Sequence, residues 1–78
     1  MTINVFTNLN CAPCNMTKKF LTENKVEFNE LQIADYADIL RDNGFTSAPV
    51  VQIIDEEGNE DVFSGGFHIN KLRSLVND

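Results

Sequence analysis

The chain has 78 residues, of which 42% are hydrophobic, so we expect one domain over residues 1–78 with a small core and modest stability. No apolar stretch is long enough to span a membrane, and the N-terminus lacks the features of a secretory signal, which predicts a cytoplasmic protein. The formal net charge of −6 argues against binding to nucleic acid or to anionic membrane surfaces.

A short strand and a helix are predicted first. Apolar residues dominate residues 2–7, which predicts a buried strand. After a polar loop, the pattern predicts a helix over residues 12–24, with Pro13 tolerated in its first turn and Asn24 as a left-handed stop. The side chains expected to face the core from this helix are Met16, Phe20 and Leu21.

The middle of the chain predicts an irregular strand and a second, short helix. Two alternating runs, at residues 26–28 and 31–33, are out of phase, which predicts a strand with a bulge or an irregular end. Asp35 is a candidate cap for the following helix, and Asn43-Gly44 is expected to end it. The side chains expected to share one face of this helix are Tyr36, Ile39 and Leu40.

A hairpin and a final helix are predicted next. Residues 50–54 form a strong strand pattern, and residues 61–63 form the returning strand after a turn. Asn70 is predicted to cap a helix that packs through Leu72, Leu75 and Val76. Acidic residues around the turn predict a solvated loop, the alternative being a docking surface for a basic partner. They are Asp55, Glu56, Glu57, Glu60 and Asp61.

The predicted order is therefore β-α-β-α-β-β-α. The first two strands should be parallel and joined by a right-handed crossover, and the last two should form an antiparallel hairpin. We expect an α/β fold in which a four-stranded mixed sheet carries helices on both faces.

The only two cysteines lie between the first predicted strand and the first predicted helix, in the motif Cys11-Ala12-Pro13-Cys14. The start of a helix carries partial positive charge and free N–H groups, which favour a thiolate over a thiol. We expect Cys11 to be the more exposed sulfur and the nucleophile, and Cys14 to be the more buried resolving thiol. This arrangement predicts thiol–disulfide exchange.

Two other interpretations of the cysteine pair are less favourable. A zinc site usually needs four ligands, whereas the chain offers one cysteine pair and a lone His68, so no metal is expected. A purely structural disulfide would close a very small ring and stabilise little. In a reducing cytosol a cysteine pair is catalytic or metal-binding more often than structural.

Two further features precede the predicted hairpin and the last helix. Ala48-Pro49 stands directly before a strong strand pattern, where proline alone leaves a cis and a trans peptide about equally favoured. Gly65-Gly66 would let backbone approach backbone or a bound peptide, or would form an ordinary flexible turn. His68 is predicted to be a surface residue rather than a catalytic base.

With these features in order, the chain resembles the thioredoxin superfamily and, more narrowly, the glutaredoxin-like NrdH redoxins. The resemblance covers nearly the whole chain. It implies a thioredoxin fold, a cis peptide before Pro49, and Ala48 and Pro49 presenting backbone to a substrate segment, with Gly65, Gly66 and Phe67 as further binding residues. The matching pieces are Val5-Phe6-Thr7 before the cysteine motif, Ala48-Pro49-Val50-Val51 and Ser64-Gly65-Gly66-Phe67.

The resemblance also bears on the source of electrons. Glutaredoxins contact glutathione through a lysine shortly before the motif and an aspartate after the glycine pair, whereas this chain has Asn8 at the first place and no acid at His68 or Ile69. The segment is similar instead to the NrdH pattern Gly-Phe-Arg-Pro-Asp, with His68, Ile69 and Asn70 replacing its last three residues. The motif Cys-Ala-Pro-Cys differs from the commoner Cys-Val-Gln-Cys.

Taken together, the resemblance implies a dithiol electron donor that binds no cofactor, and a monomer is the default expectation. It would reduce a disulfide of ribonucleotide reductase and be recharged by thioredoxin reductase with NADPH, with Phe67 as an apolar contact for the reductase. One alternative is a glutathione-dependent glutaredoxin. Another is a module that holds an iron–sulfur cluster between two protomers through Cys11.

Overall fold

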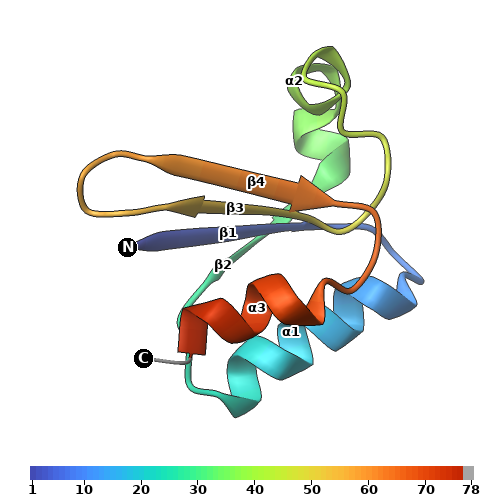
Figure 1. Cartoon of the computed structure of the whole chain (residues 1–78). Helices are drawn as coiled ribbons and strands as arrows, with labels where there is room; N and C mark the ends of the chain where they lie inside the picture. Colours follow the sequence, from blue (N-terminus) through green and yellow to red (C-terminus); the bar gives the residue numbers. More distant parts are fainter. Residues whose placement is uncertain (77–78) are drawn as a thin grey trace.

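The fold is described for residues 1–76 by a computed structural model (Figure 1). The predicted order of strands and helices is confirmed, with one additional 3-10 helix, η1. The elements are β1 (Thr2–Thr7), α1 (Ala12–Glu23), β2 (Asn29–Gln32), η1 (Ile33–Tyr36), α2 (Ala37–Asp42), β3 (Val50–Ile54), β4 (Glu60–Ser64) and α3 (Ile69–Val76).

The four strands form one mixed sheet in the order β2-β1-β3-β4. β1 is parallel to β2 and antiparallel to β3, and β3 is antiparallel to β4, as predicted. Figure 1 shows α1 and α3 side by side on one face of the sheet and α2 on the other. The expected sheet with helices on both faces is therefore confirmed.

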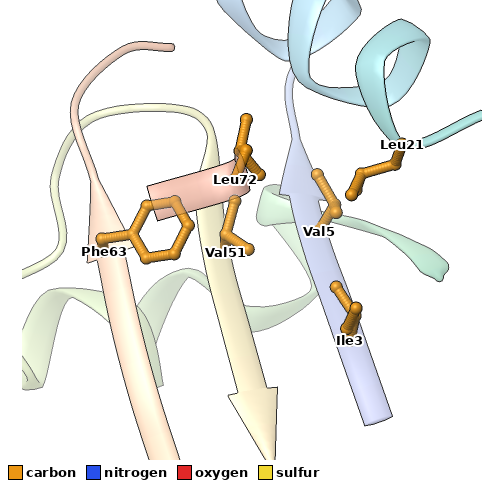
Figure 2. Close-up of a cluster of buried hydrophobic side chains, with 6 residues drawn as sticks. All are labelled: Ile3, Val5, Leu21, Val51, Phe63 and Leu72. Carbon is orange, nitrogen blue, oxygen red and sulfur yellow. The ribbon is translucent and has the colours of Figure 1, made fainter. Parts of the chain in front are cut away.

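The core is divided by the sheet into two clusters of buried side chains. Because successive side chains of a strand point to opposite faces, Val5 and Val51 face α1 and α3, whereas Phe6 and Val50 face α2. The first cluster, shown in Figure 2, comprises Ile3, Val5, Leu21, Val51, Phe63 and Leu72. The second comprises Phe6, Leu40 and Val50. Burial on both faces explains why the central strands are apolar without strict alternation.

Two predictions for α1 are wrong. Met16 is 51% exposed rather than buried, because the side of the helix that faces the sheet is set by other residues. These are Cys14, Thr17 and Leu21, which follow the three- and four-residue spacing of a helix face. The left-handed residue that ends the helix is Lys25, with φ +58°, whereas Asn24 has φ −95°. Asn24 instead donates its side-chain amide to the Phe20 carbonyl.

The second strand is shorter than predicted. β2 begins at Asn29, which pairs with Asn4, and the preceding residues 26–28 are not part of the sheet. Val26 and Phe28 nevertheless pack against the first cluster from the loop. Of the two alternating runs, only the second overlaps a strand, through Leu31 and Gln32, because Ile33 already begins η1.

Two predicted helix caps are also wrong. Asp35 lies within η1, and α2 begins after Tyr36 without a side-chain cap. Asn70 is the second residue of α3, whose first turn closes by a hydrogen bond from the Leu72 N–H to the His68 carbonyl. Of the three side chains predicted to share one face of the second helix, only Leu40 is buried.

The acidic turn between β3 and β4 is organised by Asp55. Its carboxylate accepts hydrogen bonds from the backbone N–H groups of Glu57 and Asn59, at 2.9 and 2.8 Å, and from the Asn59 side-chain amide. These bonds, chiefly that from the Asn59 backbone, hold the pKa of Asp55 below its ordinary value of 3.8. The surrounding acidic side chains are exposed, as predicted for a solvated loop.

Replacing Asp55 with alanine is expected to lower the melting temperature at pH 7. Because the pKa of Asp55 is depressed in the fold, its charged form stabilises the fold above the unfolded value near 3.8, and this contribution is lost as the pH falls through the folded value. The difference in melting temperature between wild type and Asp55→Ala should therefore shrink below pH 3.8. Glu56→Ala is the control, and a difference constant from pH 7 to pH 3 would contradict the prediction.

None of the helices within residues 1–76 has the length and apolar character needed to cross a bilayer.

Candidate active site

Three loops meet at one edge of the sheet, at the right of Figure 1. Phe6 pairs with Val50, which also pairs with Ser64, so β1 ends, β3 begins and β4 ends at the same level. The segment from Asn8 to Cys11 follows β1, the segment ending at Pro49 precedes β3, and the Gly65-Gly66 pair follows β4. The topology thus brings together all three features singled out in the sequence.

The two cysteines are joined as a disulfide at the start of α1. Their Cα atoms are 5.2 Å apart, within the ordinary range for a disulfide. Cys14 lies in the first turn of the helix with 1% of its surface exposed, whereas Cys11 is only partly buried. The predicted difference in exposure between the two sulfurs is therefore confirmed.

Cys11 is the N-cap residue of α1. Its Sγ accepts a hydrogen bond from the Cys14 N–H at 3.2 Å, in the manner of a serine or aspartate cap. Pro13 has no N–H, so the amide of Cys14 is the one that the first turn directs at this sulfur. On reduction the same N–H and the helix dipole would favour the thiolate of Cys11 over the thiol.

The peptide bond between Ala48 and Pro49 is cis, as the resemblance implied. Pro49 is buried, and Ala48 is partly exposed directly before β3. A Cβ placed on Gly65 would lie 4.0 Å from the Cβ of Ser47, so the loop after β4 runs alongside the segment that carries the cis peptide.

The loop after β4 needs its two glycines. Gly65 and Gly66 have φ of +83° and +121°, values that residues with a Cβ rarely adopt. His68 closes the loop, because its Nε2–H donates a hydrogen bond to the Ser64 carbonyl at 2.6 Å. Phe67 is half-buried, and its ring forms a T-shaped pair with that of Phe20 at a centroid distance of 6.2 Å. His68 is thus half-buried rather than a free surface residue, and its Nε2 is engaged in the hydrogen bond that closes the loop.

Sequence reasoning missed a polar cluster beside the cysteine segment. Thr7, the last residue of β1, is buried and donates its hydroxyl to Oε2 of Glu30 at 3.0 Å. Lys18 donates its ammonium to the same oxygen at 2.8 Å. The Lys18 hydrogen bond, followed by that from Thr7, holds the pKa of Glu30 below its ordinary value of 4.5.

The edge that carries the cysteine pair is free of formal charge in its three segments. Residues 8–17, 43–54 and 62–70 contain no Asp, Glu, Lys or Arg, although the whole chain has a net charge of −6. Leu9, which precedes the motif, is 87% exposed. A partner that contacts these three segments meets neutral and apolar groups, and Arg41 of α2 lies beside them in a pocket with Asn8, Thr46 and Ser47.

The strand order, the cysteine pair at the start of α1 and the cis proline before β3 define a class of protein. This fold and this site are those of a thiol–disulfide oxidoreductase of the thioredoxin superfamily.

Comparisons with known proteins narrow this class. Residues 3–57 match the glutaredoxin family. The glutaredoxin-like protein NrdH of Lactococcus lactis subsp. cremoris is 30% identical over 77 residues, which cover 95% of this chain and 99% of that protein. The solved NrdH-redoxin of Escherichia coli covers 100% of this chain and 99% of its own, with a TM-score of 0.82 and 26% identity. The solved thioredoxin-like protein BC3987 is 35% identical with a TM-score of 0.74, and the match covers 95% of this chain and 99% of that protein. The chain thus belongs to the glutaredoxin family, as an NrdH-like redoxin.

Proposed function

We propose that this redoxin carries electrons to a disulfide of ribonucleotide reductase in the cytoplasm and is recharged by thioredoxin reductase with NADPH. The observation that carries the proposal is the pairing of one accessible sulfur, Cys11, with one buried sulfur, Cys14, at a helix start. The similarity to proteins named NrdH supports the choice of partner. We further propose that it acts as a monomer and binds no cofactor of its own.

The proposed exchange transfers two electrons in two displacement steps. The Cys11 thiolate attacks one sulfur of the substrate disulfide, and the bonding pair leaves with the second sulfur, which takes a proton from solvent. Cys14 then loses its proton and attacks Sγ of Cys11, which releases the first substrate sulfur as a thiolate. The substrate is left as a dithiol, and the redoxin is left with the Cys11–Cys14 disulfide seen in the structure.

Backbone groups beside the cysteines are proposed to bind the substrate segment. Ala48 and Pro49 lie at the start of β3, with the Gly65-Gly66 loop alongside. An extended peptide could use the main chain of Ala48 there, as peptides do at strand edges. Phe67, proposed as an apolar contact for the reductase, offers only the part of its ring that does not pack against Phe20 and the core.

The charge pattern supports a protein reductant over glutathione. Glutathione carries carboxylates, which are best bound by charge-assisted hydrogen bonds from lysine or arginine. The three segments around the cysteines hold no such side chain, and the basic residue that lines a pocket with them is Arg41 of α2. The E. coli NrdH-redoxin is described as glutaredoxin-like with a thioredoxin-like activity profile, and we propose the same profile for this chain.

Reduction of insulin disulfides coupled to NADPH oxidation tests the source of electrons. We expect turnover when thioredoxin reductase supplies the electrons and none above background with glutathione and glutathione reductase. Each assay is repeated with Cys11→Ser, which should be inactive in both. The reverse pattern of turnover would establish a glutathione-dependent glutaredoxin in place of the proposal.

A further inference from the structure

One carboxylate oxygen ties both ends of the cysteine-bearing segment together. Oε2 of Glu30 accepts from Thr7 at 3.0 Å and from Lys18 at 2.8 Å. Thr7 ends β1, shortly before Cys11, and Lys18 lies one helical turn after Cys14. The Glu30 side chain on β2 therefore joins the strand that leads into the motif to the helix that leads out of it.

The contact is built into the register of the sheet. Glu30 pairs with Val5, and Val5 faces α1 together with Ile3 and Leu21. Thr7 lies two residues beyond Val5, so its side chain points to the same face. Lys18 is one turn before the helix residues that pack on β1, and 28% of its side chain is exposed. β1, α1 and the Glu30 carboxylate thus meet on the same face of the sheet.

Each partner has a physical reason to hold the contact. Thr7 is buried, and a buried hydroxyl without a partner costs free energy. Glu30 offers a charged acceptor, and the depressed pKa of its carboxyl, due first to Lys18 and then to Thr7, shows that the contact favours the ionised form. Lys18 supplies the compensating positive charge. Their shared oxygen makes the three residues one unit.

We propose that Glu30 is a positioning residue for thiol–disulfide exchange, which fixes the approach of Cys14 to Cys11 by clamping β1 to α1. Closing the ring requires the two sulfurs to meet in a narrow geometry, and small misplacements of reacting groups are costly. A clamp on both sides of the motif raises the effective concentration of Cys14 at Cys11. It therefore stabilises the disulfide relative to the dithiol.

The test is the equilibrium of the purified protein with a dithiol redox buffer, using Glu30→Ala and Glu30→Gln. Glu30→Ala removes the acceptor, and we expect the equilibrium constant for disulfide formation to fall about threefold to tenfold. That fold-change corresponds to a reduction potential about 14 to 30 mV more positive. Glu30→Gln keeps an acceptor oxygen for Thr7 and Lys18, so its equilibrium constant should lie between those of wild type and Glu30→Ala.

Matched controls separate clamping from loss of charge. Glu27→Ala removes an exposed carboxylate from the loop before β2, and Lys19→Met removes an exposed ammonium next to Lys18. Both should leave the equilibrium constant within a factor of two of wild type, while Lys18→Met should shift it in the same direction as Glu30→Ala.

Two results would overturn the proposal. The first is a Glu30→Ala equilibrium constant within a factor of two of wild type. The second is a Glu30→Gln shift as large as that of Glu30→Ala, since charge rather than the clamp would then be responsible. A lower melting temperature with an unchanged potential would mean that Glu30 serves stability only. The inference rests on the exchange chemistry of the cysteine pair alone, so it stands or falls separately from the choice of reductase.

Discussion

Serine in place of Cys14 should stop turnover and trap the redoxin on its partner. Cys11 keeps its place as the N-cap and can still attack a disulfide, but serine cannot displace it from the resulting mixed disulfide. An intramolecular thiol acts at a very high effective concentration, so multiple-turnover activity should fall on the order of a thousandfold or more. The measurement is insulin reduction, with the covalent adduct detected by non-reducing electrophoresis and mass spectrometry.

The matched variant is Cys11→Ser. It removes the partly exposed sulfur and leaves only Cys14, of which 1% is exposed, so it should give neither turnover nor adduct. The difference between the two variants assigns the roles of nucleophile and resolving thiol. A stable adduct from Cys11→Ser, or normal turnover from Cys14→Ser, would reverse or remove that assignment.

Truncating Leu21 to alanine should cost a large part of the stability of the fold. Leu21 is fully buried and lies between α1 and the sheet, where Figure 2 shows it next to Val5. Removing a buried leucine side chain typically costs about 2–5 kcal/mol through lost burial and the cavity left behind. Since small domains are stable by only about 5–15 kcal/mol, Leu21→Ala should unfold at markedly lower denaturant concentration.

Leu9→Ala provides the matched control for this effect. It makes the same chemical change at a side chain that is 87% exposed, so the free energy of unfolding should change by less than about 0.5 kcal/mol. Urea unfolding of both oxidised proteins gives the comparison. Equal losses in the two variants would show that burial in the cluster around Leu21 is not what stabilises the fold.

Elements with strong local patterns could be predicted from the sequence. The apolar run at residues 50–54 and the turn after it gave a hairpin with nearly the observed bounds. The cysteine pair could be placed at the start of α1 because Pro13 and the preceding strand pattern both favour a helix beginning there. These features depend on neighbours in the chain, so the sequence alone carries them.

Features that depend on distant partners could not be predicted in this way. Met16 looks like a core residue by type, but the sheet packs against the side of α1 that carries Thr17 and Leu21. The contact of Glu30 with Thr7 and Lys18 needs the register of β2 against β1, and the out-of-phase runs around residue 29 obscure where that strand begins. Tertiary packing determines both the buried side of α1 and the contact of Glu30.

The burial of Cys14 has a consequence for how this redoxin would work with the electron donor and the electron acceptor proposed for it. With Cys11 as the more exposed sulfur, the proposed electron donor and the proposed electron acceptor would have to bind at the same site in turn. If both proteins react at Cys11, we expect ping-pong kinetics, and an excess of either protein should slow the cycle by competition. Fast dissociation of the redoxin after each exchange would therefore matter as much as tight binding.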